Sequence, residues 1–119
     1  MKKLSNKEEE VMRLFWNKGA MFVREMVELY EEPRPHFNTL STIVRSLETK
    51  GFVGHKSYGP TYLYFPIVSK EEYSSAKMKN FVNCYFKNSY LNMVSFFVKK
   101  EKISIDELKA LIEEAEKGE

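Results

Sequence analysis

Residues 36–51 read HFNTLSTIVRSLETKG, and this stretch decides the fold that the sequence predicts. Apolar residues recur in it at spacings of three and four, which is the stripe of an amphipathic helix: Leu40, Ile43, Val44 and Leu47. Gly51 supplies a permissive stop after the last of them. We therefore expect one helix here, with its apolar side against a core.

The other side of this helix is polar in an unusual way. It carries short donors and acceptors with one arginine, rather than the glutamates and lysines of a solvated helix: Asn38, Thr39, Ser41, Thr42, Arg45, Ser46 and Thr49. Asparagine can pair with adenine, arginine can pair with guanine, and threonine methyls can touch thymine methyls. Serine and threonine also lower helix propensity, so another use should compensate for them. DNA contact is one such use, and an ordinary surface is the alternative.

Two more helices are expected before residue 36. Ser5 and Glu8 form a capping-box pattern that begins the first, and Gly19 ends it. The apolar stretch at 21–22 leads into a second helix that begins at Val23 and ends near Glu32, because prolines follow at 33 and 35. His36, which follows the second proline, is expected to cap or precede the third helix.

After Gly51, residues 52–67 read FVGHKSYGPTYLYFPI, two β-prone runs around Tyr58-Gly59-Pro60-Thr61. This pattern predicts a β-hairpin. Three helices followed by a hairpin is the order of a winged helix-turn-helix, in which the third helix enters the major groove and the hairpin flanks the DNA backbone. We assign this domain to residues 1–68. His55, Lys56 and Tyr62 of the hairpin fit phosphate contact, but they also fit an ordinary solvated turn.

Residues 69–119 are expected to form three amphipathic helices. Capping-box patterns at Ser69 with Glu72 and at Ser104 with Glu107 mark two of the starts. Their apolar side chains exceed what a closed N-terminal domain can cover, so a symmetric homodimer is the simplest way to bury them. The alternative is a subdomain that folds back on its own wing. The predicted dimerisation residues are Tyr73, Met78, Phe81, Val82, Tyr85, Phe86, Leu91, Val94, Phe97, Leu108, Leu111 and Ile112.

Composition narrows the class of protein. A chain of 119 residues, 43% hydrophobic and 14% aromatic, is long enough for one core but too short for two independent ones. No run reaches the roughly 18 apolar residues of a membrane helix, and no signal-peptide pattern opens the chain, so we expect a cytoplasmic protein. Cys84 is the one cysteine, which excludes an internal disulfide and a multi-thiolate metal site, and we expect it to pack on its helix.

Charge is uneven along the chain although its net value is only +2. Residues 33–64 carry four basic side chains against one acidic, whereas residues 101–119 carry three against seven. A basic middle segment is compatible with phosphates, and equally with lysines on ordinary helix surfaces.

Other functions are weighed against DNA binding. An enzyme needs convergent reactive groups, but the chain has two histidines, a distant cysteine and no phosphate loop or metal motif, so we expect no catalysis, no metal and no cofactor. A protein-interaction module or adaptor without sequence-specific DNA binding is the main alternative, although its binding face should carry more apolar side chains. RNA binding is disfavoured because no stacking platform is evident.

The chain resembles the penicillinase-repressor family, the BlaI/MecI/CopY group of winged-helix repressors. The resemblance covers essentially the whole chain, in the opening LSNKEEEVMRLFW, the central FNTLSTIVRSLETKGFVGHK, the wing strand YLYFPIVSKEEY and the terminal ISIDELKALI. It implies a dimeric transcriptional repressor of antibiotic-resistance type that reads a palindromic operator with TACA/TGTA-like half-sites. The family's DNA contacts fall on Asn38, Thr39, Ser41, Thr42 and Arg45. Ser41, Arg45 and Ser46 differ from residues in some relatives.

The resemblance also bears on induction. In the β-lactamase branch a sensor protease cuts the repressor at an Asn-Phe step, which aligns with Phe96-Phe97 after Ser95 in this chain. The asparagine is absent, so three options stay open: the same protease, another protease, or no cleavage. The copper-responsive branch carries paired C-terminal cysteines, and with Cys84 alone copper sensing is disfavoured.

Overall fold

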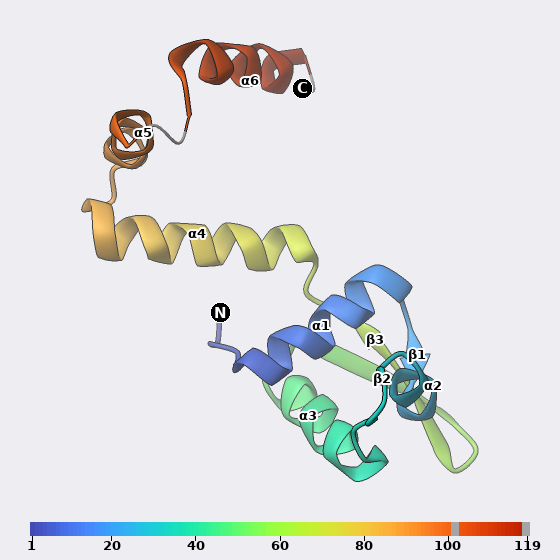
Figure 1. Cartoon of the computed structure of the whole chain (residues 1–119). Helices are drawn as coiled ribbons and strands as arrows, with labels where there is room; N and C mark the ends of the chain where they lie inside the picture. Colours follow the sequence, from blue (N-terminus) through green and yellow to red (C-terminus); the bar gives the residue numbers. More distant parts are fainter. Residues whose placement is uncertain (101–102, 118–119) are drawn as a thin grey trace. The chain divides into compact units, whose positions relative to one another are not determined.

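The computed structural model describes residues 1–100 and 103–117, which divide into two units, Met1–Ser75 and Ala76–Glu119. Figure 1 follows the order of the elements along the chain. The predicted class, mostly helical with a small hairpin and a winged helix followed by C-terminal helices, is confirmed.

Helix α1 (Asn6–Lys18) begins as predicted at a complete capping box, in which Ser5 Oγ accepts from the Glu8 amide and Glu8 accepts from the Ser5 amide. It ends at Gly19, whose φ of 82° lies in the region that only glycine adopts readily. Helix α2 (Val23–Glu28) is about one turn shorter than predicted. The predicted end near Glu32 is wrong because the Leu29 and Tyr30 amides turn back to carbonyls three residues earlier, which closes the helix before the prolines.

Helix α3 (Phe37–Thr49) matches its prediction closely. His36 is its N-cap, since the Asn38 amide donates to His36 Nδ1 at 3.0 Å. Leu40, Val44 and Leu47 are buried, and they place the helix against α1 and α2. The apolar stripe read from the sequence therefore fixes which side of α3 faces outward.

The predicted hairpin consists of β2 (Val53–Tyr58) and β3 (Thr61–Pro66), joined at Gly59 and Pro60. A third strand was not predicted: β1 (Met21–Phe22) pairs antiparallel with β3, with Met21 opposite Tyr64, so the sheet order is β1-β3-β2. Two residues are too few to show a strand pattern in sequence. This strand ties the start of α2 to the wing and so holds the wing beside the helices.

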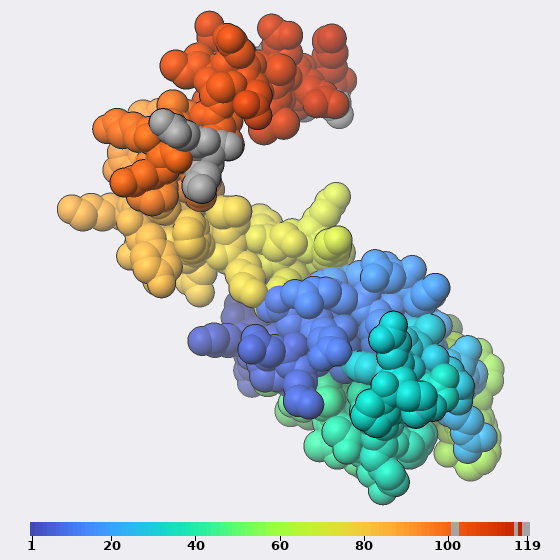
Figure 2. All heavy atoms as spheres, in the orientation of Figure 1, coloured from blue at the N-terminus to red at the C-terminus, as the bar shows by residue number. Residues whose placement is uncertain are grey.

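The N-terminal unit has one hydrophobic core, and Figure 2 shows its atoms as a packed body. Phe15, Phe52, Met12 and Met26 are its largest fully buried side chains. The unit extends past the predicted boundary at 68–69, because Tyr73 in the first turns of α4 (Lys70–Phe86) packs against Trp16 and Phe52. The Tyr73 hydroxyl also donates to Glu9 at 2.6 Å. Tyr73 thus belongs to the N-terminal core rather than to the dimerisation residues among which it was predicted.

The second unit comprises the rest of α4, α5 (Tyr90–Lys99) and α6 (Ile105–Lys117). The caps at Ser69 and Ser104 are present, with each serine Oγ accepting from the amide three residues later. Among the described residues of this unit, Val82 is the one buried hydrophobic side chain. The unit therefore leaves most of its apolar surface exposed.

Candidate DNA-binding surface

The outward side of α3 is the first part of the candidate surface. Asn38, Thr39, Thr42 and Arg45 are exposed, and Ser41 is half-buried. These five side chains share one helix and one side because the apolar stripe occupies the other side. The structure thus brings together most of the predicted helix residues.

Two threonines on α3 donate their hydroxyl protons to backbone carbonyls of the same helix. Thr42 Oγ1 donates to the Asn38 carbonyl at 2.9 Å, and Thr49 Oγ1 donates to the Arg45 carbonyl at 3.0 Å. A threonine bonded in this way presents its methyl group and oxygen lone pairs outward. Lone pairs do not suit a phosphate, which is itself an acceptor, but a methyl group suits the methyl of thymine. Thr42 is therefore a candidate for base contact rather than backbone contact.

Arg45 carries the positive charge on this side of α3. Within residues 1–100 and 103–117 its guanidinium forms no ion pair with a carboxylate, whereas Arg13 and Arg34 both do. The nearby carboxylate of Glu48 interacts instead with His55 of β2. An exposed guanidinium with five donors and no internal acceptor is suited to a guanine edge or a phosphate.

Ser46 differs from the other predicted residues. It is half-buried, and its hydroxyl donates to Glu8 Oε2 at 2.8 Å, on the side of α3 that faces α1. Lys50 Nζ reaches the other oxygen of the same carboxylate at 2.7 Å. Ser46 thus connects two helices through its hydroxyl proton, and its contact with DNA stays a prediction.

The Glu8 carboxylate is the centre of this connection. Burial alone would raise its pKa, but hydrogen bonds from Lys50, from Ser5 and from Ser46 outweigh burial and lower the pKa from 4.5 to about 2. The carboxylate is therefore ionised at neutral pH. Its three partners come from the N-terminus of α1 and the C-terminal end of α3, so these bonds hold α3 against α1.

The wing supplies the second part of the candidate surface. Lys56 is exposed and forms no ion pair in the described part of the chain. His55 is less available, because its ring stacks on Tyr62 with centroids 4.3 Å apart and its Nδ1 contacts Glu48 of α3. His55, stacked on Tyr62, therefore connects the wing to α3, while the ammonium group of Lys56 is available to bind a phosphate.

Sequence reasoning missed two residues beside this surface, Phe37 and Arg24. Phe37 is 46% exposed at the start of α3, and it precedes Ser41 and Arg45 at spacings of four. That spacing puts all three on one side of the helix, so the signal was present in the sequence. Arg24 lies on α2, and no pattern in the sequence relates it to α3.

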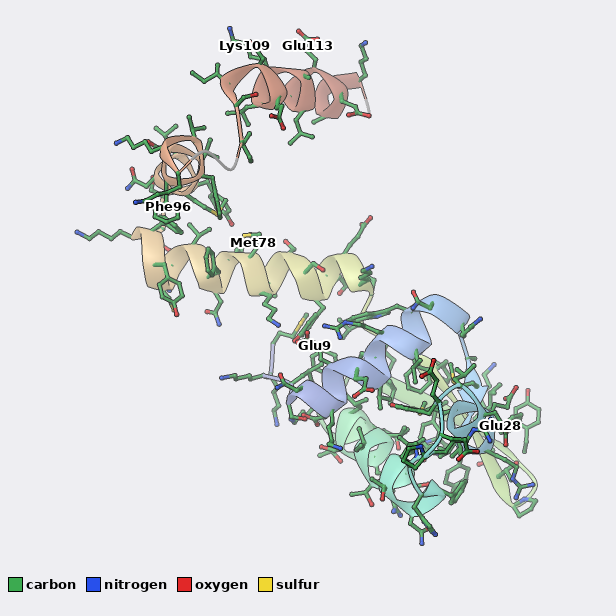
Figure 3. The ribbon with its side chains drawn as sticks, viewed as in Figure 1. Glu9, Glu28, Met78, Phe96, Lys109 and Glu113 are labelled. Atoms are coloured by element: carbon green, nitrogen blue, oxygen red, sulfur yellow. The ribbon has the colours of Figure 1, made fainter. Side chains whose placement is uncertain are left out.

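Of the twelve predicted dimerisation residues, six are exposed, five are half-buried and one is buried. Leu91 is 78% exposed and Tyr85 73%, and Met78, labelled in Figure 3, projects from α4. Val82 differs because it is already buried within one chain, so it supports its own unit. Cys84, expected to pack, is exposed. The remaining predicted residues, apart from Tyr73 and Val82, are exposed or half-buried: Met78, Phe81, Tyr85, Phe86, Leu91, Val94, Phe97, Leu108, Leu111 and Ile112.

The Phe96-Phe97 step lies inside α5, where Phe96 packs edge-on against Phe86 of α4. A protease binds its substrate in an extended form, so cleavage here requires the helix to unwind locally. The predicted cleavage step is therefore in folded structure rather than in a loop.

The described residues hold no group of three or more histidine, cysteine or acidic side chains arranged for a metal ion. In the same residues, no helix combines the length and apolar character needed to cross a membrane.

Comparison with known proteins places the chain in a family. The sequence pattern of the penicillinase repressor family matches residues 4–117. The methicillin resistance regulatory protein MecI of Staphylococcus aureus strain N315 is 30% identical over 111 residues, which cover 91% of this chain and 89% of that protein. The penicillinase repressor of Bacillus licheniformis is 27% identical over 115 residues, covering 93% and 90%. These relatives are named as a regulator and a repressor, not as enzymes. The chain therefore belongs to the penicillinase repressor family of transcriptional repressors.

Proposed function

We propose that this protein is a homodimeric repressor that acts in the cytoplasm and binds a palindromic operator through α3, with the wing on the DNA backbone. The observation that carries the proposal is the outward side of α3, where Asn38, Thr42 and Arg45 are exposed and the arginine has no carboxylate partner in the described chain. Such a side chain set can read base edges in the major groove.

Dimerisation is the second half of the proposal. It is supported by the exposed apolar side chains of residues 76–117, among them Tyr85, Leu91 and Leu111. Soluble monomers rarely leave so many large apolar groups in water. A symmetric pair of these units would bury them and would present two copies of α3 to two half-sites about one helical turn apart.

The deciding experiment is selection of bound duplexes from random double-stranded DNA by the full chain. We expect an inverted repeat with TACA/TGTA-like half-sites, because two identical domains related by a twofold axis read the same bases in opposite directions. Enrichment of unrelated sequences would contradict sequence-specific reading. An asymmetric single site would contradict the dimer.

Salt dependence separates this proposal from a protein-interaction module. Each phosphate neutralised by Arg or Lys releases a counterion, so operator affinity should fall steeply as salt rises. A flat response would indicate that the winged helix binds another protein. The Phe96-Phe97 step and a sensor protease stay predictions about induction, and the binding experiment does not depend on them.

A further inference from the structure

A surface cleft of about 330 Å³ lies between α3 and the wing. Four of its ten lining residues are aromatic: Phe22 from β1, Phe37 from α3, and Tyr62 and Tyr64 from β3. Arg24 of α2 and Arg45 of α3 also line it, and Ser41 adds a hydroxyl group. A cleft of this size with apolar walls and a few convergent polar groups has the character of a small-molecule site.

The charge of the cleft indicates the chemistry of its occupant. Neither arginine forms an ion pair anywhere in the described residues, although α2 carries two glutamates. One of these, Glu28, pairs with Arg34 instead, and Glu48 of α3 interacts with His55. The aromatic side chains are thus combined with two guanidinium groups that have no carboxylate within ion-pair distance in the described residues, although Glu25 and Glu28 lie beside Arg24. Guanidinium groups bind carboxylates in a forked geometry, and rings stack on aromatic faces.

Tyr64 contributes a neutral hydroxyl to the cleft. Burial raises its pKa, and Glu48 raises it further, while Arg45 acts in the opposite direction. The phenol therefore stays protonated at neutral pH and adds no negative charge that would repel an anion.

From these observations we propose that the cleft binds a small aromatic carboxylate of one or two rings, and that its occupation excludes DNA. The carboxylate group lies between Arg24 and Arg45, and the ring lies against Phe22 and Phe37. Because Arg45 and Ser41 also belong to the proposed DNA-reading side of α3, one ligand and one operator compete for them. The second half of this proposal rests on the proposed function, but ligand binding itself does not.

The test uses 2-naphthoate as the probe and the neutral 2-naphthamide as its matched control, titrated into the full chain labelled with nitrogen-15. We expect naphthoate to shift the amide resonances of residues 22–24, 37–45 and 61–64 in a saturable way, and naphthamide to bind more weakly by about tenfold or more. Absence of saturable shifts would overturn the proposal. Equal binding of the amide would overturn the role given to the arginines.

Two arginine variants locate the binding site. Arg24→Gln should weaken naphthoate binding by about tenfold or more, because it removes one fork of the carboxylate site. Arg34→Gln is the matched control, since Arg34 is also exposed but is paired with Glu28 and Glu32 and lies outside the cleft. Equal losses in the two variants would indicate general charge attraction and would overturn the assignment.

A competition experiment separates the two proposals. Saturating naphthoate should release the chain from its selected operator, whereas naphthamide at the same concentration should not. If naphthoate binds the cleft and leaves the operator complex intact, the exclusion of DNA is wrong. If the chain binds no operator even without ligand, the proposed function fails, while the naphthoate titration still decides whether the cleft is an anion site.

Discussion

The two units of this chain differ in how much of their apolar side-chain surface is buried. Residues 1–75 bury side chains from every element into one core, including Phe15 and Phe52 at 1% exposure. Residues 76–117 carry large apolar groups at similar density, yet Val82 is the one that is buried among those described. The first unit therefore has a closed core within one chain, whereas the exposed apolar surface of the second supports the proposed dimer.

Removing the second unit tests this comparison most severely. A chain ending at Ser75 should stay folded, because Tyr73 and the whole core are retained, and it should sediment as a monomer. Its operator affinity should fall by about 10²- to 10⁴-fold, since the two half-sites are no longer bound by linked domains. Circular dichroism and sedimentation measure the first two outcomes, and gel shift measures the third. A dimeric 1–75 fragment would show that the dimer interface lies in the winged helix and would contradict the role proposed for residues 76–117.

The next largest effect is expected from two single substitutions, one in each unit, that separate monomer stability from dimer affinity. Phe15→Ala should destabilise the N-terminal unit by about 3–5 kcal/mol, because it leaves a cavity in a closed core. Leu91→Ala changes a side chain that is 78% exposed, so monomer stability should change by less than about 0.5 kcal/mol while dimer affinity falls. Urea unfolding and sedimentation equilibrium separate the two effects. If Leu91→Ala leaves the dimer intact, α5 is not at its centre.

The sequence predicts the first unit far better than the second, for a physical reason. Periodic apolar stripes and capping boxes are local signals, and in α1 and α3 they coincide with the buried sides. The two-residue strand β1 and the packing of Tyr73 on Trp16 depend on contacts between distant residues, so no local pattern shows them. In α5 and α6 the stripes are present, but the described residues of the chain do not bury them, so no local pattern can identify what covers them.

The candidate site is also predicted well where the signal is local and poorly where it depends on distant residues. The polar side of α3 follows directly from the position of its apolar stripe, which is why Asn38, Thr42 and Arg45 are exposed. The hydrogen bond from Ser46 to Glu8 was not predicted, because the two residues lie 38 positions apart along the chain. Nothing in the sequence near residue 46 indicates a carboxylate on α1.

Acid should weaken the first unit through Glu8. The folded pKa of about 2 lies below the ordinary value of 4.5, so the stabilisation is complete above pH 4.5 and is lost as pH falls toward 2. The full effect is at most ~3 kcal/mol. Glu8→Gln should remove this part of the pH dependence of unfolding. Glu113→Gln, at an exposed position of α6 (Figure 3), is the matched control and should follow the unmodified chain. Identical acid profiles for all three chains would show that Glu8 does not hold α1 to α3.

The smallest effect is expected from Arg45→Ala, which should change DNA affinity without changing dimer affinity. If Arg45 contacts a base of the selected operator, the substitution should weaken binding by about 1–3 kcal/mol and relax selectivity at one position of each half-site. Stability and dimer affinity should not change, because the guanidinium is exposed and has no carboxylate partner in the described chain. Lys56→Ala offers the matched comparison on the wing: it should weaken binding equally for all sequences and reduce the salt dependence by about one phosphate. A uniform loss with Arg45→Ala would reassign that arginine to the DNA backbone, and specificity would then have to come from the other exposed candidates on α3, such as Asn38 and Thr42.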